Sequence, residues 1–205
     1  MHTNSSINSI LNEIMKHEDK VFSSSDFLNI CEYDNIRQSL SRLEKQGIIK
    51  KVIRGFYYKP IYSELLNEYS LPSPYQTALA IARKYNWIII PSKNTALNEL
   101  GLSSQVSNKY SFISDGPYRK FMIGEIEIEF KHTSKRLINN SPYKINLIIQ
   151  ALDALKNNIT QDQINIIMRQ LNANELNILL NETKTKINIY NIIKKINLSQ
   201  GELNA

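Results

Sequence analysis

Three patterns in this 205-residue sequence predict an α+β fold. Residues 23–59 combine a helical apolar stripe, a glycine and two short β-rich runs, which is typical of a winged helix-turn-helix. Residues 87–131 hold short alternating runs, which predict a small, mainly antiparallel sheet within an α/β domain. Residues 143–197 are helical in pattern throughout and form a C-terminal tail. We therefore expect two domains, residues 1–60 and residues 61–205.

The expected recognition helix covers residues 35–46. Ile36, Leu40 and Leu43 recur at i, i+4 and i+7, so one stripe of this helix should be buried. The opposite stripe is polar and basic, with Arg37, Gln38, Ser41, Arg42 and Lys45. Such a helix can pack on one side and present hydrogen-bonding side chains on the other.

The flanks of this helix complete the motif. Asp34 is placed to cap its start, and Gly47 can supply the left-handed residue that ends it. The runs 48–52 and 56–58 then read as a hairpin around Arg54 and its neighbouring glycine. Before the helix, Ser23 and Asp26 have the spacing of a capping box for a short helix, and residues 6–18 predict a first helix.

The charge of the chain is concentrated in one window. Residues 35–59 hold seven cations and one anion, a net charge of +6 that equals the charge of the whole chain. The cations are Arg37, Arg42, Lys45, Lys50, Lys51, Arg54 and Lys59. A basic helix and hairpin suit the phosphates of double-stranded DNA, because each contact releases a condensed counterion. The alternative is an ordinary solvated face.

The second domain should begin near the Pro72-Ser73-Pro74 segment, which interrupts a helical pattern over 61–69. We expect the following elements: helices over 74–85 and 94–100, a buried strand over 87–90, and strands over 110–114, 119–123 and 125–131 in an antiparallel meander. In the tail, Thr160 and Gln163 form a capping box. The apolar stripes of this tail exceed what a small sheet can cover. A surface for a partner protein or for a dimer is therefore an alternative to burial in the core.

Composition excludes several classes of protein. No apolar run approaches the roughly 20 residues of a membrane span, and the N-terminus lacks the pattern of a secretory signal, so we expect a cytoplasmic protein. A single cysteine, Cys31, excludes internal disulfides and cysteine-rich zinc sites. We expect no cofactor and no metal.

Motifs of catalysis are scarce, and we do not expect an enzyme. One arrangement still fits a metal-dependent nuclease: Asp115 on a turn, followed by Glu125, Glu127, Glu129 and Lys131 on one face of a strand. The simpler interpretation is that these charges solvate the exposed face of an antiparallel strand.

Several phrases together resemble the AbiEi-type antitoxins of abortive-infection toxin-antitoxin systems. They are Ser25-Asp26-Phe27-Leu28, IRQSLSRLEKQGIIKKVIRGFYYKP, SPYQTALAIARKYNWIIIPSKNTALNELGLSSQ and FISDGP. The likeness covers roughly residues 7 to 137. The chain departs from the family at Cys31, at Lys93 and at Ser107, where glycine, glycine and proline are expected.

The resemblance implies a phage-defence antitoxin that represses its own operon. The DNA-reading role would fall on Arg37, Gln38, Ser41 and Arg42, with Lys50, Lys51 and Arg54 on the wing. The DNA would be an operator with inverted repeats, bound by a monomer or a homodimer. Residues 74–197 would neutralise a nucleotidyltransferase-type toxin, by direct contact or otherwise. A competing hypothesis is a winged-helix protein-interaction module without specific DNA binding.

Overall fold

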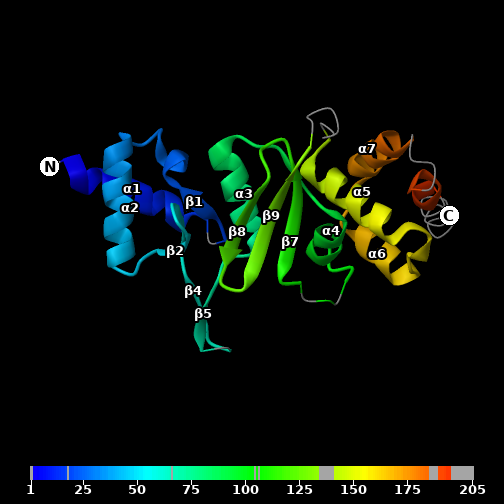
Figure 1. The fold of residues 1–205 in the computed structure, drawn as a ribbon, viewed down its shortest axis with the longest axis horizontal. Coiled ribbons are helices and arrows are strands. Elements are labelled where there is room, and N and C mark those ends of the chain that lie inside the picture. Colours follow the sequence, from blue (N-terminus) through cyan, green and yellow to red (C-terminus); the bar gives the residue numbers. More distant parts are fainter. Residues whose placement is uncertain are drawn as a thin grey trace. The chain divides into compact units, whose positions relative to one another are not determined.

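The structure, a computed structural model, describes residues 2–17, 19–65, 67–103, 105, 107–133, 141–184 and 189–194 (Figure 1). It is a mixed α/β fold with small, mainly antiparallel sheets and C-terminal helices. The chain forms two compact units, Met1–Ile88 with Lys120–Ile128 and Ile89–Arg119 with Glu129–Ala205. The expected division into domains of residues 1–60 and 61–205 stays a prediction. Every described helix is too short or too polar to cross a lipid bilayer.

The first unit starts with three helical segments and a three-stranded sheet. Its elements are α1 (His2–Met15), β1 (Val21–Ser23), the 3₁₀ helix η1 (Ser24–Phe27), α2 (Tyr33–Lys45), β2 (Lys50–Ile53) and β3 (Phe56–Tyr58). The sheet has the order β1-β3-β2 and is antiparallel, so the expected hairpin is confirmed and gains a third strand. The predicted capping box is also present: the Ser23 N–H donates to the Asp26 carboxylate at 2.7 Å.

The core beneath these elements is the one that the apolar stripe of α2 predicted. Ile36, Leu40 and Leu43 are at most 1% exposed and pack with Ile10 and Ile14 of α1. Two phenylalanines fill the space beside them, since the rings of Phe22 and Phe27 stack at 5.5 Å between centroids. Burial of this stripe leaves the opposite side of α2 in solvent.

Of the two predictions for the ends of α2, one is wrong and one is confirmed. The predicted cap is wrong: the helix begins at Tyr33, Glu32 is the N-cap residue, and Asp34 lies in the first turn, where a carboxylate still favours the helix dipole. Gly47 is confirmed as the left-handed residue after the helix, with φ of 74°. No atom lies within 4 Å of a Cβ built at Gly47, so the backbone conformation and not lack of space favours glycine there.

The helix predicted over 61–69 is wrong. This segment is a hairpin of β4 (Ile61–Ser63) and β5 (Glu68–Ser70). Asn67 adopts a left-handed φ of 52° in the turn and accepts a hydrogen bond from the Tyr62 hydroxyl. The rings of Tyr62 and Tyr69 pair across the strands at 5.2 Å. Turn chemistry and cross-strand aromatic contact thus override a short helical pattern.

Helix α3 (Pro74–Tyr85) has the bounds that the sequence predicted. Ser73 caps it by accepting a hydrogen bond from the Gln76 N–H at 3.1 Å, and Asn86 ends it in a left-handed conformation. Its last turn contacts the first unit's small sheet, because Arg83 donates to Asp26 at 2.6 Å and to the Val21 carbonyl at 2.8 Å. Helix α3 therefore belongs to the same unit as the basic helix α2.

A four-stranded sheet contains β6 (Ile89–Pro91), β7 (Lys109–Ser114), β8 (Arg119–Ile123) and β9 (Ile126–His132), in the order β6-β7-β9-β8. The predicted meander is wrong, because it would place β8 between β7 and β9. Three pairs of residues, Ser111 with Glu129, Phe112 with Phe130 and Ser114 with Thr133, advance together along both strands, so β7 and β9 run parallel. The central position goes to β9 because its middle residues are buried, whereas most of β8 is solvated.

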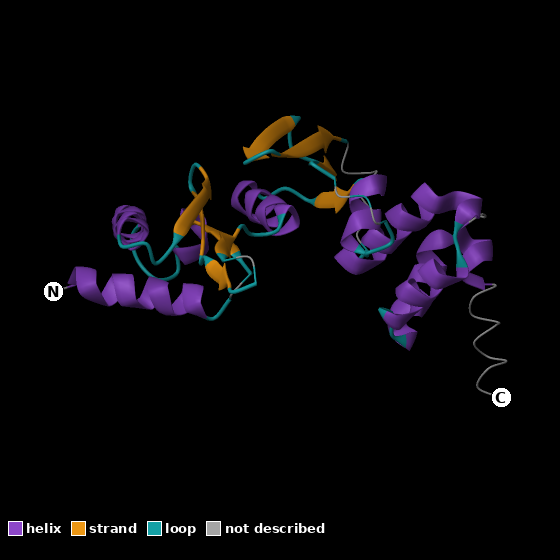
Figure 2. Cartoon of the chain, turned by 90° about the horizontal axis from the view of Figure 1, so that it is seen from below, coloured by secondary structure: helices purple, strands orange, loops and turns teal. Residues whose placement is uncertain are grey.

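The C-terminal helices build a separate core (Figure 2). They are α5 (Tyr143–Leu155), the 3₁₀ helix η3 (Lys156–Asn158), α6 (Gln161–Arg169), α7 (Ala173–Thr183) and a helical segment at 189–194, joined by α4 (Lys93–Glu99). The capping box of Thr160 and Gln163 is confirmed. No large apolar side chain in the described parts of 141–194 is among the exposed ones, so these helices cover one another's apolar faces. The predicted tail at 185–188 and 195–197 lies outside the described residues.

Candidate nucleic-acid interface

The polar stripe of α2 lies where the sequence predicted. Arg37, Gln38, Arg42 and Lys45 are exposed and Ser41 is half-buried, on the side of the helix away from its buried apolar stripe. The spacing of these residues along 3.6 residues per turn places all five on one face. The face is long enough to present several side chains to one extended ligand.

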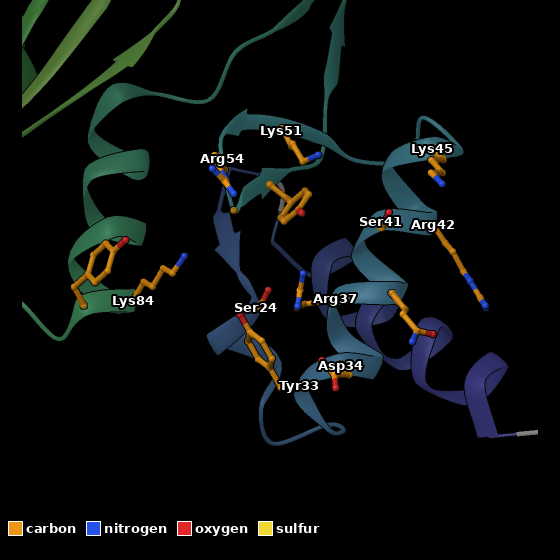
Figure 3. Close-up of a pocket in the computed structure, with 14 residues that line it drawn as sticks. Ser24, Tyr33, Asp34, Arg37, Ser41, Arg42, Lys45, Lys51, Arg54 and Lys84 are labelled. Carbon is orange, nitrogen blue, oxygen red and sulfur yellow. The ribbon is translucent and has the colours of Figure 1, made fainter.

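This face forms one wall of a groove with a volume of about 1000 Å³, which we call the basic groove (Figure 3). The hairpin of β2 and β3 and the last turn of α3 line it as well. The lining residues are Ser24, Tyr33, Asp34, Arg37, Gln38, Ser41, Arg42, Lys45, Lys51, Arg54, Gly55, Tyr57, Lys84 and Tyr85. Three elements that are separate in sequence therefore share one concave surface within the first unit.

The groove brings together seven of the eight residues that the sequence analysis assigned to DNA. Lys50 is the exception and does not line it. Its ammonium lies instead 4.0 Å from the ring centre of Tyr69, on the hairpin of β4 and β5. Alternation along β2 explains this, because Lys50 and Lys51 point to opposite sides of the strand.

The groove is strongly cationic. Six of its lining residues carry a positive charge, namely Arg37, Arg42, Lys45, Lys51, Arg54 and Lys84, and one, Asp34, carries a negative charge. Lys51 has an acidic partner, since its Nζ lies 2.7 Å from the Glu44 carboxylate, and this hydrogen bond raises the pKa of Lys51. The other five cations make no ion pair with an acidic residue in the part of the chain that the structure describes.

Aromatic rings support several of these cations. The Arg37 guanidinium lies 5.9 Å from the ring centre of Tyr33, and the Lys51 ammonium lies 5.8 Å from that of Tyr57. Ring faces attract cations without neutralising them. The charge of Arg37 thus stays available to an anionic ligand, whereas the charge of Lys51 is already paired with Glu44.

Lys84 and Tyr85 are residues of the groove that the sequence analysis did not identify. They lie in the last turn of α3, beyond the expected domain boundary, where a lysine is explained by the helix dipole alone. Figure 3 shows the Lys84 side chain extending from α3 toward the β2–β3 hairpin that carries Lys51 and Arg54. Lys84 and Tyr85 line the groove because α3 packs beside this hairpin, which the sequence pattern does not show.

Two of the carboxylates considered for a nuclease, Glu127 and Glu129, are bound by other side chains. Glu127 accepts hydrogen bonds from Lys120 at 3.0 and 3.3 Å, and Glu129 is bound within the second unit. Among the described residues, no three His, Cys, Asp or Glu side chains come close enough to hold a metal ion. Asp115 is not brought together with Glu127, Glu129 and Lys131 as a group of ligands.

Glu129 differs from the solvated strand residue that the sequence predicted. It is 4% exposed and accepts hydrogen bonds from the Tyr118 hydroxyl at 2.8 Å and from the Ser111 hydroxyl at 3.1 Å. Lys109 and Lys131 lie 3.0 and 3.5 Å from it. Burial opposes its ionisation, but the hydrogen bonds and the lysine charges outweigh burial and lower the pKa of Glu129 to about 2. It is a satisfied structural charge.

Comparison with protein-family models finds a match over residues 9–179, to a family described as a family of unknown function, DUF6088. A search of curated proteins finds no match. The description of this family names no activity.

Proposed function

We propose that this chain, which belongs to the DUF6088 family, is a DNA-binding antitoxin that represses its own toxin-antitoxin operon. In this proposal the elements of residues 1–60 act as a winged helix-turn-helix, with α2 as the recognition helix and the β2–β3 hairpin as the wing. One observation carries the DNA-binding part: six cations from three elements line one groove together with a single acidic side chain.

The residues of the groove divide into two roles. Gln38 and Arg42 lie on the exposed face of α2, and both side chains can form paired hydrogen bonds with base edges in the major groove. Lys45, Lys51 and Arg54, with Lys50 on the other side of the hairpin, suit contacts to phosphates, which set the position and orientation of the protein on the duplex. Arg37 and Ser41 lie on the same exposed face of α2 as Gln38 and Arg42.

The antitoxin part of the proposal rests on the resemblance to AbiEi-type proteins. The resemblance assigns the neutralisation of a nucleotidyltransferase-type toxin to residues 74–197. The cytoplasmic location, which was expected from the sequence, stays part of the proposal. Co-expression with the toxin gene of the same operon tests this part. Growth of cells that carry both genes, but not of cells with the toxin alone, supports it.

Fluorescence anisotropy with the promoter duplex of the operon and with a scrambled duplex tests the DNA-binding part. Arg42→Ala should reduce the binding free energy by about 1–3 kcal/mol and relax the preference for one base. Lys45→Ala should weaken binding to both duplexes by the same factor and make the affinity less dependent on salt. Equal, sequence-blind losses would refute these roles. Absence of binding by the unmodified protein at low salt would end the proposal and favour a protein-interaction module.

A further inference from the structure

Helix α3 is fastened to the N-terminal elements of the first unit by Arg83. Its guanidinium donates to the Asp26 carboxylate through Nε at 2.6 Å and to the Val21 carbonyl through Nη2 at 2.8 Å. The Asp26 side chain is 9% exposed and also accepts a hydrogen bond from the Ser23 N–H. The Arg83 side chain itself is 40% exposed, and this charge-assisted contact joins the last turn of α3 to β1 and η1.

The same turn carries Lys84 to the edge of the hairpin. Its Nζ lies 4.7 Å from the ring centre of Phe56, and a Cβ built at Gly55 would lie 3.2 Å from it. Gly55 directly follows Arg54 in the turn between β2 and β3. The ammonium of Lys84 is therefore held beside the hairpin turn that carries Arg54.

The structural explanations for Lys84 leave its charge unbalanced. A lysine in the last turn of a helix complements the dipole, and its ammonium is attracted to the face of the Phe56 ring. Yet this half-buried ammonium has no ion pair with an acidic residue among those that the structure describes, and it faces a groove with five further cations. Bringing like charges together costs free energy, which an external polyanion would offset.

We propose that Lys84 is a DNA-phosphate contact on the wing side of the basic groove, and that Arg83 is the positioning residue that holds it there. The inference rests on the proposed DNA binding and extends it past residue 60. Lys84 and Arg54 would bind the same backbone segment, next to the major groove that α2 enters. The segment after the winged helix would then contribute to affinity without reading sequence.

The full-length protein tests this with Lys84→Ala and a matched control, Lys20→Ala. Lys20 is also half-buried, and its ammonium lies 5.1 Å from the ring centre of Phe22, but it does not line the groove. By anisotropy at 0.1 M salt, Lys84→Ala should lower the affinity for the promoter duplex and for the scrambled duplex by about tenfold. It should also reduce the slope of log affinity against log salt concentration by about 1. Lys20→Ala should leave both quantities nearly unchanged.

A second variant separates charge from packing. Lys84→Met keeps a long side chain but removes the charge and should lose as much affinity as Lys84→Ala, whereas Lys84→Arg keeps the charge and should retain the affinity. Arg83→Ala should lower affinity in the unmodified chain but add little in the Lys84→Ala background. An additive loss would show that Arg83 contacts DNA itself and would overturn its positioning role.

The outcomes distinguish this inference from the proposal beneath it. If Arg54→Ala weakens binding while Lys84→Ala and Lys84→Met behave like Lys20→Ala, Lys84 serves only the helix and the inference is overturned, while DNA binding stands. If the unmodified protein binds neither duplex, the proposed function fails.

Discussion

Lys51 of β2 and Glu44 of α2 form an ion pair with 2.7 Å between Nζ and the carboxylate, at the edge of the basic groove. The pair joins the hairpin to the helix and neutralises one groove cation before any ligand binds. Both side chains are partly solvated, with 46% and 28% exposure, so a phosphate can compete with Glu44 for the ammonium. If the proposed DNA binding holds, Glu44 would limit how strongly the hairpin attracts a duplex.

Glu44→Gln should strengthen DNA binding. Removal of the carboxylate frees Lys51 and eliminates repulsion between Glu44 and the backbone, so affinity for any duplex should rise about three- to tenfold at 0.1 M salt, with a steeper salt dependence. Anisotropy over a salt series measures both. Glu13→Gln, on α1 and outside the groove, is the control; equal gains in the two variants would contradict this role of Glu44.

Asp26→Asn should destabilise the first unit. The substitution keeps the shape of the side chain but removes the charge that binds Arg83. It also places an amide donor against one of two existing donors, the Ser23 N–H or the Arg83 guanidinium. We expect a loss of about 1–3 kcal/mol in the free energy of unfolding, measured by urea denaturation. Full stability in Asp26→Asn would mean that Arg83 does not hold α3 in solution.

Gly47→Ala should destabilise α2 through its backbone. Gly47 has a φ of 74°, and an added methyl group meets no other atom within 4 Å, so the cost of about 1–2 kcal/mol comes from the left-handed conformation alone. Gly47→Asn should cost less, because asparagine tolerates this region, as it does at Asn67 and Asn86. Thermal unfolding followed by circular dichroism gives the order; equal costs would show that another contact matters.

Glu129 should make stability depend on acid. Its pKa is about 2 in the folded protein, below the value of 4.5 for a free glutamate, so the unfolded chain binds more protons between these values. The stabilisation is present above pH 4.5 and is lost as the pH falls toward 2.

The comparison of Glu129→Gln with the unmodified chain measures this effect. At pH 7 the variant should be less stable by about 1–3 kcal/mol, and the difference should shrink as the pH falls. Glu127→Gln, two residues away on a more solvated part of β9, should show a smaller difference. If the difference in the free energy of unfolding between Glu129→Gln and the unmodified chain stays constant from pH 7 to pH 3, the assigned ionisation of Glu129 is contradicted.

The elements that the sequence predicted well are those with strong local signals. Helix α3 has a proline in its first turn, a serine cap and an asparagine at its end, and its bounds agree with the prediction. The errors fall where local signals compete. The segment at 61–69 was predicted as a helix from a few apolar positions, but Asn67 and the Tyr62–Tyr69 pair make it a hairpin.

The candidate site was predicted in part for the same reason. Arg37, Gln38, Ser41 and Arg42 follow from the periodicity of one helix, and Lys51 and Arg54 from one hairpin next to it. Lys84 had no signal of its own, because nothing in the order of residues says that the end of α3 lies against Gly55. Glu129 was misjudged for a similar reason: alternation along β9 gives its face but not the burial of that face under Tyr118 and Ser111.

The sequence by itself determined which side of α2 is buried and where the positive charge of the chain is concentrated, because helical periodicity and charge are properties of neighbouring residues. The tertiary structure decided the order of the strands and the third wall of the basic groove. Both depend on which surfaces pack together, and the contact of Arg83 with Asp26 joins residues that are 57 positions apart. Contacts at such separations are selected by the free energy of the whole fold and leave no local pattern.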